Sequence, residues 1–409
     1  MRRIRCLFSL ALLGFSTAFG SALPEGFVEE RFVDNLRSPS AMAFGPGGNL
    51  FVAERVVGEL RMVNAKGKLR AEPVLRVLTP RKRDGSMLDG RGHRSGGLRG
   101  FAFDPEFPGE PYLYVFYMHD APRHNRLSRF TLTTDGTMRA VDGSEKVLID
   151  LPFREGGETG GSHNGGAVLF GADGKLYVTT GDGFDRKHDS VQSLETFTGK
   201  VLRLNRDGSI PDDNPFRGET RGAHRSIYAL GLRNPYALAL DPSTGTMLLN
   251  DCSGRRKAAI YKLEAGANFG VSLDTGLIPA WKESYVGRRS EPVADAAIGK
   301  LDWLVTGGAW YPKGGSFPEE YHGSYFVALW GFNNDRPGAI HRLTPGRGGK
   351  VVPFASGVGL PKDPKQDPVF LTSARKPASL AVGPDGNLYW LGTTYRTSRG
   401  AVYRIAWRD

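Results

Sequence analysis

Cysteine is scarce in this sequence, and its scarcity limits how the chain can be held together. Only Cys6 and Cys252 are present among the 409 residues. Cys6 lies in an N-terminal stretch with the composition of a cleaved export signal, which leaves Cys252 alone in the mature chain. No intramolecular disulfide can then form, even in an oxidising compartment. Cohesion must come from packing and from closure of the fold.

Long apolar runs are also lacking after the N-terminus. Residues 1–22 place three arginines ahead of an apolar run that ends on small residues, which is typical of a secretory signal peptide. That run is too short to span a membrane. We therefore expect a mature chain of residues 23–409 that is periplasmic or secreted and has no transmembrane segment.

Several motifs of known chemistry are missing. The sequence has no H-E-x-x-H, no paired cysteines and no calcium loop of alternating acids. It also has no G-x-S-x-G elbow, which argues against a Ser-His-Asp hydrolase. The net charge is +11, but the basic residues are not interleaved with an aromatic recognition motif, so nucleic acid is not an expected partner. The basic surface is either simply solvated or attracts an anionic cofactor, a polysaccharide or a membrane surface.

What the sequence does contain is a repeat of two short apolar strands joined by a turn rich in Gly, Pro and Asp. The six copies are AMAFGPGGNLFVAE, GFAFDPEFPGEPYLYVFY, AVLFGADGKLYVTTGD, ALALDPSTGTMLLND, GAWYPKGGSFPEEYHGSYFVALW and SLAVGPDGNLYWLGT. Equivalent turn positions are separated by 59, 67, 70, 70 and 72 residues: Pro46, Pro105, Ala172, Pro242, Pro312 and Pro384. Such a constant spacing indicates a repeat architecture.

Each hairpin is followed by a further strand in which a basic residue stands among apolar ones. These strands read GELRMV, RLSRFTL, GKVLRL, AAIYKL, GAIHRL and GAVYRI. Three to four strands per repeat, with few helical periods between them, predict an all-β fold and a six-bladed β-propeller that fills residues 23–409 as a single domain. Residues 26–33 could pair with the last blade and close the ring, which would protect two sheet edges.

In a propeller the first strand of each blade lines the central channel, so residues just before these strands meet at one end of it. His163 lies there between glycines, where an imidazole can act as a general base near neutral pH. The alternative is a histidine capped by loop carbonyls. Arg233, before an Asn-Pro pair, either binds an anionic ligand or clamps neighbouring carbonyls.

Taken together, these motifs resemble the soluble glucose/sorbosone dehydrogenases. The segments that carry the resemblance are LRSPSAMAFGPGGNLFVAERVVGELRMV, SGGLRGFAFDPEF, HNGGAVLFGADGKLYVTTGDG, TGKVLRLNRDGSIPDDNPF, YALGLRNPYALALDP and LEAGANFG. They cover nearly the whole mature chain in the order found in the family. The resemblance implies a propeller that binds pyrroloquinoline quinone (PQQ) and Ca²⁺ and oxidises an aldose or a related sugar, with electrons passed on to a separate acceptor.

The resemblance also implies roles for individual residues. His163 would take the proton of the substrate hydroxyl while hydride passes to the quinone, and Arg233 would steady the developing negative charge. Asn234, Arg336 and Lys376 would hold the cofactor.

The chain departs from the family at the cofactor and metal positions. Ser95 and Ser162 replace residues that are usually Gln and an acid or His. The loop that in the family supports calcium with acids reads CSGRRKAAI from Cys252 onward, with three cations in place of carboxylates. Calcium would then depend on Asp251 and on the backbone carbonyls of Ser253 and Gly254.

Two other functions stay open from the sequence alone. The scaffold could be a binding propeller without redox chemistry, which recognises a carbohydrate or an exported protein, since a fold does not establish an activity. A six-bladed lactonase is the third possibility, although the acidic metal ligands that such an enzyme needs are not apparent near the channel.

Overall fold

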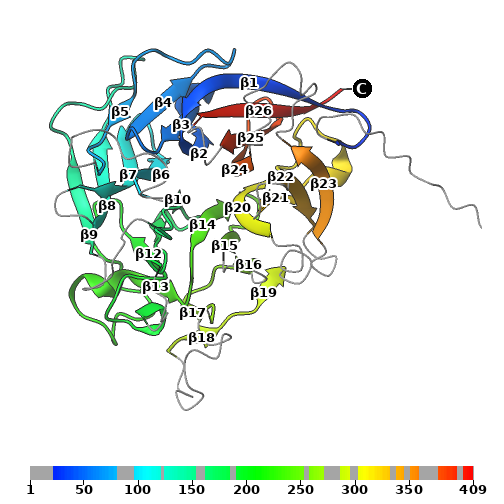
Figure 1. The fold of residues 1–409 in the computed structure, drawn as a ribbon. Coiled ribbons are helices and arrows are strands. Elements are labelled where there is room, and N and C mark those ends of the chain that lie inside the picture. The colour runs from blue at the N-terminus through cyan, green and yellow to red at the C-terminus, as the bar shows by residue number, and fades with distance from the viewer. Residues whose placement is uncertain are drawn as a thin grey trace, which may run out of the picture.

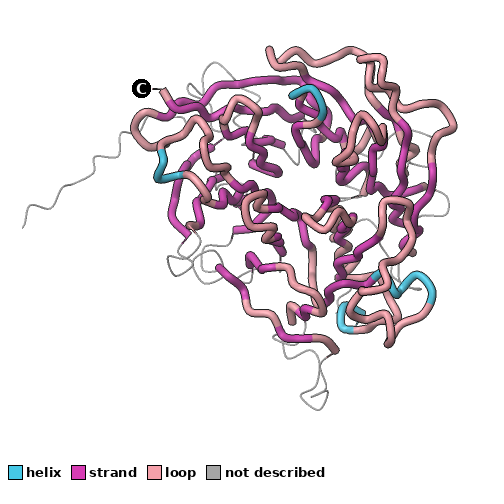
Figure 2. Tube along the Cα trace, turned by 180° about the vertical axis from the view of Figure 1, so that it is seen from behind, coloured by secondary structure: helices cyan, strands magenta, loops and turns pink. Residues whose placement is uncertain are grey.

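A ring of six β-sheets surrounds a central axis (Figure 1). The computed structural model describes residues 22–80, 96–120, 124–152, 162–184, 190–252, 258–270, 286–294, 303–331, 338–344, 351–358, 376–393 and 399–408. Helix within them is limited to short 3-10 turns at the periphery of the ring (Figure 2): Pro46–Gly48, Ser190–Gln192, Gly222–Ser226 and Glu319–Tyr321. No helix in this part of the chain is long and apolar enough to cross a membrane.

The first three sheets follow the chain order of the predicted repeats. Blade 1 contains β2 (Pro39–Phe44), β3 (Leu50–Glu54), β4 (Glu59–Val63) and β5 (Leu75–Arg76). Blade 2 contains β6 (Leu98–Phe103), β7 (Tyr112–His119), β8 (His124–Thr131) and β9 (Lys146–Leu151). Blade 3 contains β10 (Val168–Phe170), β11 (Leu176–Thr179), β12 (Lys200–Leu204), β13 (Ile227–Leu230), β17 (Ala267–Asn268) and β18 (Arg288–Arg289).

The last three sheets complete the ring. Blade 4 contains β14 (Pro235–Leu240), β15 (Met247–Cys252), β16 (Ala258–Lys262) and β19 (Pro292–Ala294). Blade 5 contains β20 (Trp303–Trp310), β21 (Tyr325–Gly331), β22 (Gly338–Leu343) and β23 (Val351–Val358). Blade 6 contains β24 (Lys376–Val382), β25 (Leu388–Thr393), β26 (Arg399–Trp407) and β1 (Phe27–Arg37).

The six-bladed β-propeller predicted from the repeat is confirmed. Each predicted hairpin forms the first two strands of a blade, and each following segment with its central basic residue forms the third. Blade 3 is larger than predicted, because β17 and β18 follow blade 4's β16 in sequence yet join the outer edge of blade 3. This return is a parallel pairing of two-residue strands, too short to leave a hydrophobic period in the sequence.

The predicted closure of the ring is also observed. β1 pairs antiparallel with β26, from Phe27 opposite Trp407 to Arg37 opposite Arg399. In Figure 1 the blue first strand runs beside the red last strand. The N-terminal strand thus completes the blade that the C-terminal repeat begins, and the pairing extends past the predicted 26–33 to Arg37.

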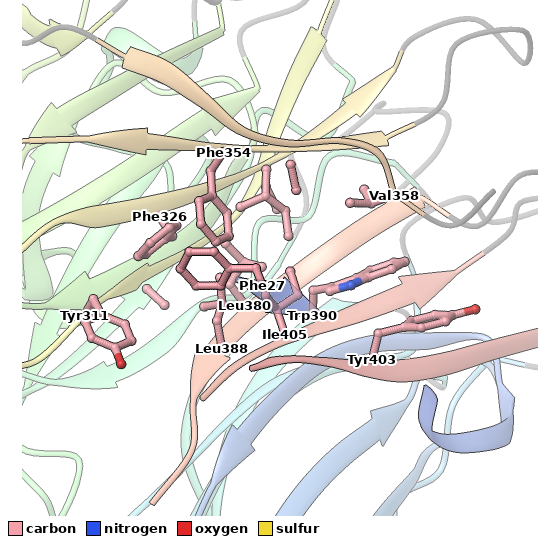
Figure 3. Close-up of a cluster of buried hydrophobic side chains, with 14 of the residues drawn as sticks. Phe27, Tyr311, Phe326, Phe354, Val358, Leu380, Leu388, Trp390, Tyr403 and Ile405 are labelled. Carbon is pink, nitrogen blue, oxygen red and sulfur yellow. The ribbon is translucent and has the colours of Figure 1, made fainter. Parts of the chain in front are cut away.

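A continuous aromatic cluster lies under this closure, between blades 5 and 6 (Figure 3). Phe27 of β1 makes edge-to-face contacts with four rings, at centroid distances of 4.7 to 5.1 Å. The four rings are those of Phe317, Tyr321, Phe354 and Trp407. Edge-to-face pairs add to the stabilisation that buried aromatic area already supplies.

The innermost strands of the six blades position the candidate site. These strands are β2, β6, β10, β14, β20 and β24, and each contacts the next around the ring. The loops that enter them therefore meet at one end of the channel, and His163, Arg233 and Lys376 lie at those entrances.

Candidate functional site

The backbone around His163 is shaped by close packing against a glycine-flanked acid. His163 precedes β10 and has a left-handed φ of 51°. Its carbonyl oxygen accepts a hydrogen bond from the Gly183 amide at 3.2 Å. A Cβ on Gly181 would lie 1.9 Å from that oxygen, so only glycine fits there. The glycines on both sides of Asp182 thus bring its carboxylate beside the imidazole.

His163 and Asp182 form a buried hydrogen-bonded pair. The Nδ1 atom of His163 lies 2.7 Å from Oδ1 of Asp182. The Asp182 side chain is fully buried, and 15% of the His163 side chain is exposed. Because an ionised carboxylate can only accept, Nδ1 must carry the proton, which makes Nε2 the basic nitrogen of the neutral ring. The sequence analysis did not anticipate this partner, which is neither a ligand nor a loop carbonyl.

The same acid links blade 3 to blade 4. The Asp182 amide donates to the Arg233 carbonyl at 2.7 Å. Asp251, which is completely buried, accepts from the backbone amides of Arg233 at 3.2 Å and Asn234 at 2.7 Å. Asn234 Oδ1 in turn accepts from the Gly165 amide at 3.3 Å. These bonds fix the two segments that were predicted to carry the site against each other.

Three cations at the channel end donate to loop carbonyls. Arg99, Arg233 and Lys376 come from blades 2, 4 and 6, and Arg99 and Lys376 are only 7% and 5% exposed. Their acceptors are the carbonyl oxygens of Gly165 at 3.2 Å, Cys252 at 2.7 Å and Gly331. In the described part of the chain, neither Arg99 nor Arg233 is within ion-pair distance of an acid. The positive charge of Arg99 and Arg233, which carbonyls hold and no described carboxylate neutralises, suits an anionic ligand.

The predicted metal ligands are only partly within reach of the structure. Ser253 and Gly254 lie outside the described residues, as does Arg336. The Asp251 carboxylate holds two backbone amides, as described above. No cluster of three or more His, Cys, Asp or Glu side chains suited to a metal occurs among the residues that the structure covers. The described donors therefore do not make up a calcium site.

A buried lysine lies in blade 3, the blade that His163 precedes. Lys200, at the start of β12, is completely buried and donates to three carbonyl oxygens. The acceptors are those of Ser190 at 3.2 Å, Val191 at 3.0 Å and Thr198 at 2.5 Å. Removal from water lowers the pKa of Lys200 to about 7. The ammonium thus holds the segment from Ser190 to Thr198 against the start of β12. The sequence analysis missed this feature.

A small pocket, partly open to solvent, lies beside His163 and has room for about one water-sized group. Its walls come from blades 2 and 3 and from the loop after β11. The lining residues are Asn125, Leu151, Pro152, His163, Asn164, Thr180, Gly181, Gly183, Phe197 and Thr198. A pocket of this size, lined by an imidazole and several polar groups, can receive one hydroxyl-sized group of a ligand.

The structure therefore brings together most of the predicted site residues that it describes. His163, Arg233 and Asn234 are joined through Asp182 and Asp251. For Asp182 the sequence does carry a signal, which is its place between two glycines at the end of a predicted strand. Asn125 and Asn164 carried no such signal, because their contact joins two blades. Lys200 bonds carbonyls close to it in the chain, but its sequence context does not mark it as buried.

A six-bladed propeller with a buried histidine–carboxylate pair and several cations at one end of its channel defines a class of small-molecule site, and comparisons with known proteins specify the family. The family model described as "Glucose / Sorbosone dehydrogenase" matches residues 36–332. The chain belongs to this family.

Individual relatives agree with that assignment. The chain is 30% identical to quinoprotein glucose dehydrogenase B of Acinetobacter calcoaceticus over 279 residues, which are 62% of this chain and 54% of that protein. It is 27% identical to the aldose sugar dehydrogenase YliI of Escherichia coli over 368 residues, 86% and 92% of the two chains. The match thus spans about half the length of the Acinetobacter protein.

The chain is also similar to a third relative and to a solved structure. The mouse Hedgehog-interacting protein is 31% identical over 257 residues, 58% of this chain and 35% of that protein. The structure of a soluble aldose sugar dehydrogenase from Escherichia coli matches with a TM-score of 0.68 at 24% identity, covering 93% of this chain and all of the other. That likeness in space establishes the shared fold.

Proposed function

We propose that this chain is a PQQ-dependent dehydrogenase that oxidises an aldose or a related sugar. The observation that carries the proposal is the His163–Asp182 pair at the pocket, together with Arg99 and Arg233 at the channel end, which no acid among the described residues pairs with. Membership of the glucose/sorbosone dehydrogenase family and the quinoprotein among its relatives support the same conclusion.

The described residues fit an anionic quinone. PQQ carries carboxylates, and Arg233, Asn234 and Lys376 offer two cations and an amide at the channel end, where Arg99 adds a third positive charge. Arg336, assigned by resemblance, would join them. When bound, PQQ supplies an acceptor for the two electrons that leave the sugar as hydride. Calcium is given no step, because the described donors do not form a site for it.

The protein's own part in the reaction is to move a proton. Oxidation of a sugar hydroxyl removes hydride from carbon and a proton from oxygen, and Nε2 of His163 would accept that proton. Asp182 keeps the imidazole in the required tautomer and stabilises the imidazolium that forms. The Arg233 guanidinium would offset negative charge that develops on the reacting oxygens.

The export signal predicted over residues 1–22 would place this reaction in the periplasm or outside the cell. A separate electron acceptor would then be needed to reoxidise the quinone after each turnover, and a dye can replace it in an assay.

Reconstitution tests the proposal directly. The purified chain is titrated with PQQ, with and without added calcium, and binding is followed by calorimetry. Dye reduction is then measured over a panel of aldoses. Binding of PQQ together with sugar-dependent dye reduction is the expected result. A chain that neither binds PQQ nor reduces the dye would overturn the proposal.

The second candidate is a propeller that binds a carbohydrate or an exported protein without redox chemistry. The observation that favours it is the similarity to the Hedgehog-interacting protein, whose name describes an interaction rather than an activity. Tight binding of a sugar without PQQ binding would favour this candidate. Calcium-dependent hydrolysis of sugar lactones without a quinone would instead favour a lactonase.

A further inference from the structure

Two buried asparagine side chains in the pocket have hydrogen-bonding atoms that no described residue satisfies. Asn125, in β8 of blade 2, donates from Nδ2 to Oδ1 of Asn164 at 3.1 Å. Asn164 directly follows His163 in the chain. The two side chains are 5% and 1% exposed. Among the described residues, Oδ1 of Asn125 and Nδ2 of Asn164 nevertheless have no hydrogen-bond partner.

This pattern does not depend on how the amides are oriented. If both amides were rotated by half a turn, Asn164 would donate to Asn125, and one acceptor and one donor would again be left over. A buried polar group without a partner costs about 1–3 kcal/mol, so native structures keep few of them. A pair of them in the wall of a pocket points to a ligand that completes the set.

The unsatisfied acceptor of Asn125 and the unsatisfied donor of Asn164 indicate what kind of ligand could bind them. A hydroxyl group donates one hydrogen bond and accepts others, so a single hydroxyl can satisfy both a free acceptor and a free donor. A carboxylate could only accept, and an ammonium could only donate.

We propose that Asn125 and Asn164 form a subsite for one sugar hydroxyl, next to the hydroxyl that His163 deprotonates. The inference rests on the proposed function, and it makes the two asparagines determinants of which sugar is accepted. A site built to bond a hydroxyl rejects analogues that lack it, because its own buried groups are then left unpaired.

Binding of deoxy sugars tests the subsite. The probes are D-glucose and its 2-, 3-, 4- and 6-deoxy analogues, measured by calorimetry with the chain free of cofactor and by kcat/KM with the PQQ-loaded chain. In the wild type, removal of one particular hydroxyl should weaken binding by about 10- to 100-fold. In Asn125→Leu that penalty should vanish, because the variant no longer pairs with the hydroxyl.

A matched control separates recognition from folding. Asn214 is also buried, at 4% exposure, but its amide bonds Arg203 and the Arg225 carbonyl away from the pocket. Asn214→Ala should lower stability and keep the wild-type preference among the sugars. An Asn125→Leu variant too unstable to assay is replaced by Asn125→Asp, which keeps an acceptor, loses the donor to Asn164 and should also alter the preference.

The outcomes distinguish this inference from the proposed function. If sugars bind with the predicted preference but are not oxidised, the subsite stands and the dehydrogenase proposal fails. If sugars are oxidised and Asn125→Leu keeps the full penalty for every deoxy analogue, the subsite is wrong and the dehydrogenase stands. A crystal structure with bound sugar in which only water bonds the two asparagines would also overturn the subsite.

Discussion

The seam that closes the ring and the channel end of blades 2 to 4 are both buried, but they bury different chemistry. Around Phe27 the seam packs one aromatic ring against another (Figure 3). Around His163 the interior holds charged and amide groups, including Asp182, Lys200 and Asp251. Apolar burial stabilises a fold, whereas buried polar groups cost free energy unless each is paired.

The contrast indicates that the seam mainly stabilises the fold, whereas the channel end mainly serves binding and chemistry. Polar groups whose burial lowers stability are retained at functional sites, where the ligand supplies the missing partners. Substitutions at the seam should therefore change the free energy of unfolding, and substitutions at the channel end should change chemistry or binding. The following predictions test that division in order of decreasing effect.

The largest effect is expected at His163. Replacement of the base that takes the hydroxyl proton should lower turnover by about 10²- to 10⁴-fold. We expect His163→Gln to give that loss while PQQ affinity, measured by calorimetry, stays near the wild-type value. Because Gln can still donate to the buried Asp182 carboxylate, the melting temperature should change much less than turnover, although the contact with Phe184 is lost. Wild-type turnover in the variant would rule out the assigned base, and failure to fold would make His163 a structural residue.

At the seam, Phe27→Ala should act on stability alone. It removes a ring that contacts four others and that is 8% exposed, which should lower the free energy of unfolding by about 3–5 kcal/mol. Urea denaturation measures the loss, and turnover of the folded fraction should equal that of the wild type. If the folded fraction of Phe27→Ala lost turnover as well as stability, the division between the seam and the channel end would be wrong.

Because of Lys200, the free energy of unfolding should depend on pH. Its folded pKa of about 7 is below the usual value of 10.5, so above pH 7 the unfolded chain binds a proton that the folded chain does not. Stability from this group therefore rises with pH between about 7 and 10, by roughly 1.4 kcal/mol per pH unit, and is constant below 7. His224 feels the charge of Lys200, since its pKa is lowered by burial and then by Lys200.

Comparison with Lys200→Met isolates this contribution, because the remaining groups are common to both proteins. Urea denaturation at pH 7, 8 and 9 should show a wild-type free energy of unfolding that rises relative to the variant. Parallel curves for the two proteins would show that the three carbonyls keep Lys200 charged throughout this range.

The sequence predicted the fold more fully than the site, for a physical reason. Turn residues and apolar strands recur in every blade, so short stretches of sequence are enough to predict the six hairpins and the closing strand. His163 and Arg233 were also found locally, since both stand at blade entrances. Asn125 could not be assigned, because its contact with Asn164 joins two blades that only the closed ring brings together, whereas Asp182 faces His163 across the ends of a single hairpin.

The smallest effect is expected from the ion pair on the surface of the seam. Arg404 of β26 bonds Glu30 of β1 and also approaches Asp385 at 3.4 Å, but Arg404 and Glu30 are 30% and 36% exposed. Water and salt screen such pairs, so Glu30→Gln should lower the free energy of unfolding by no more than about 1 kcal/mol. The loss should shrink further in 1 M salt, where the effect of Phe27→Ala should not. If the two substitutions proved equally costly, closure of the ring would depend on charge as much as on the aromatic cluster.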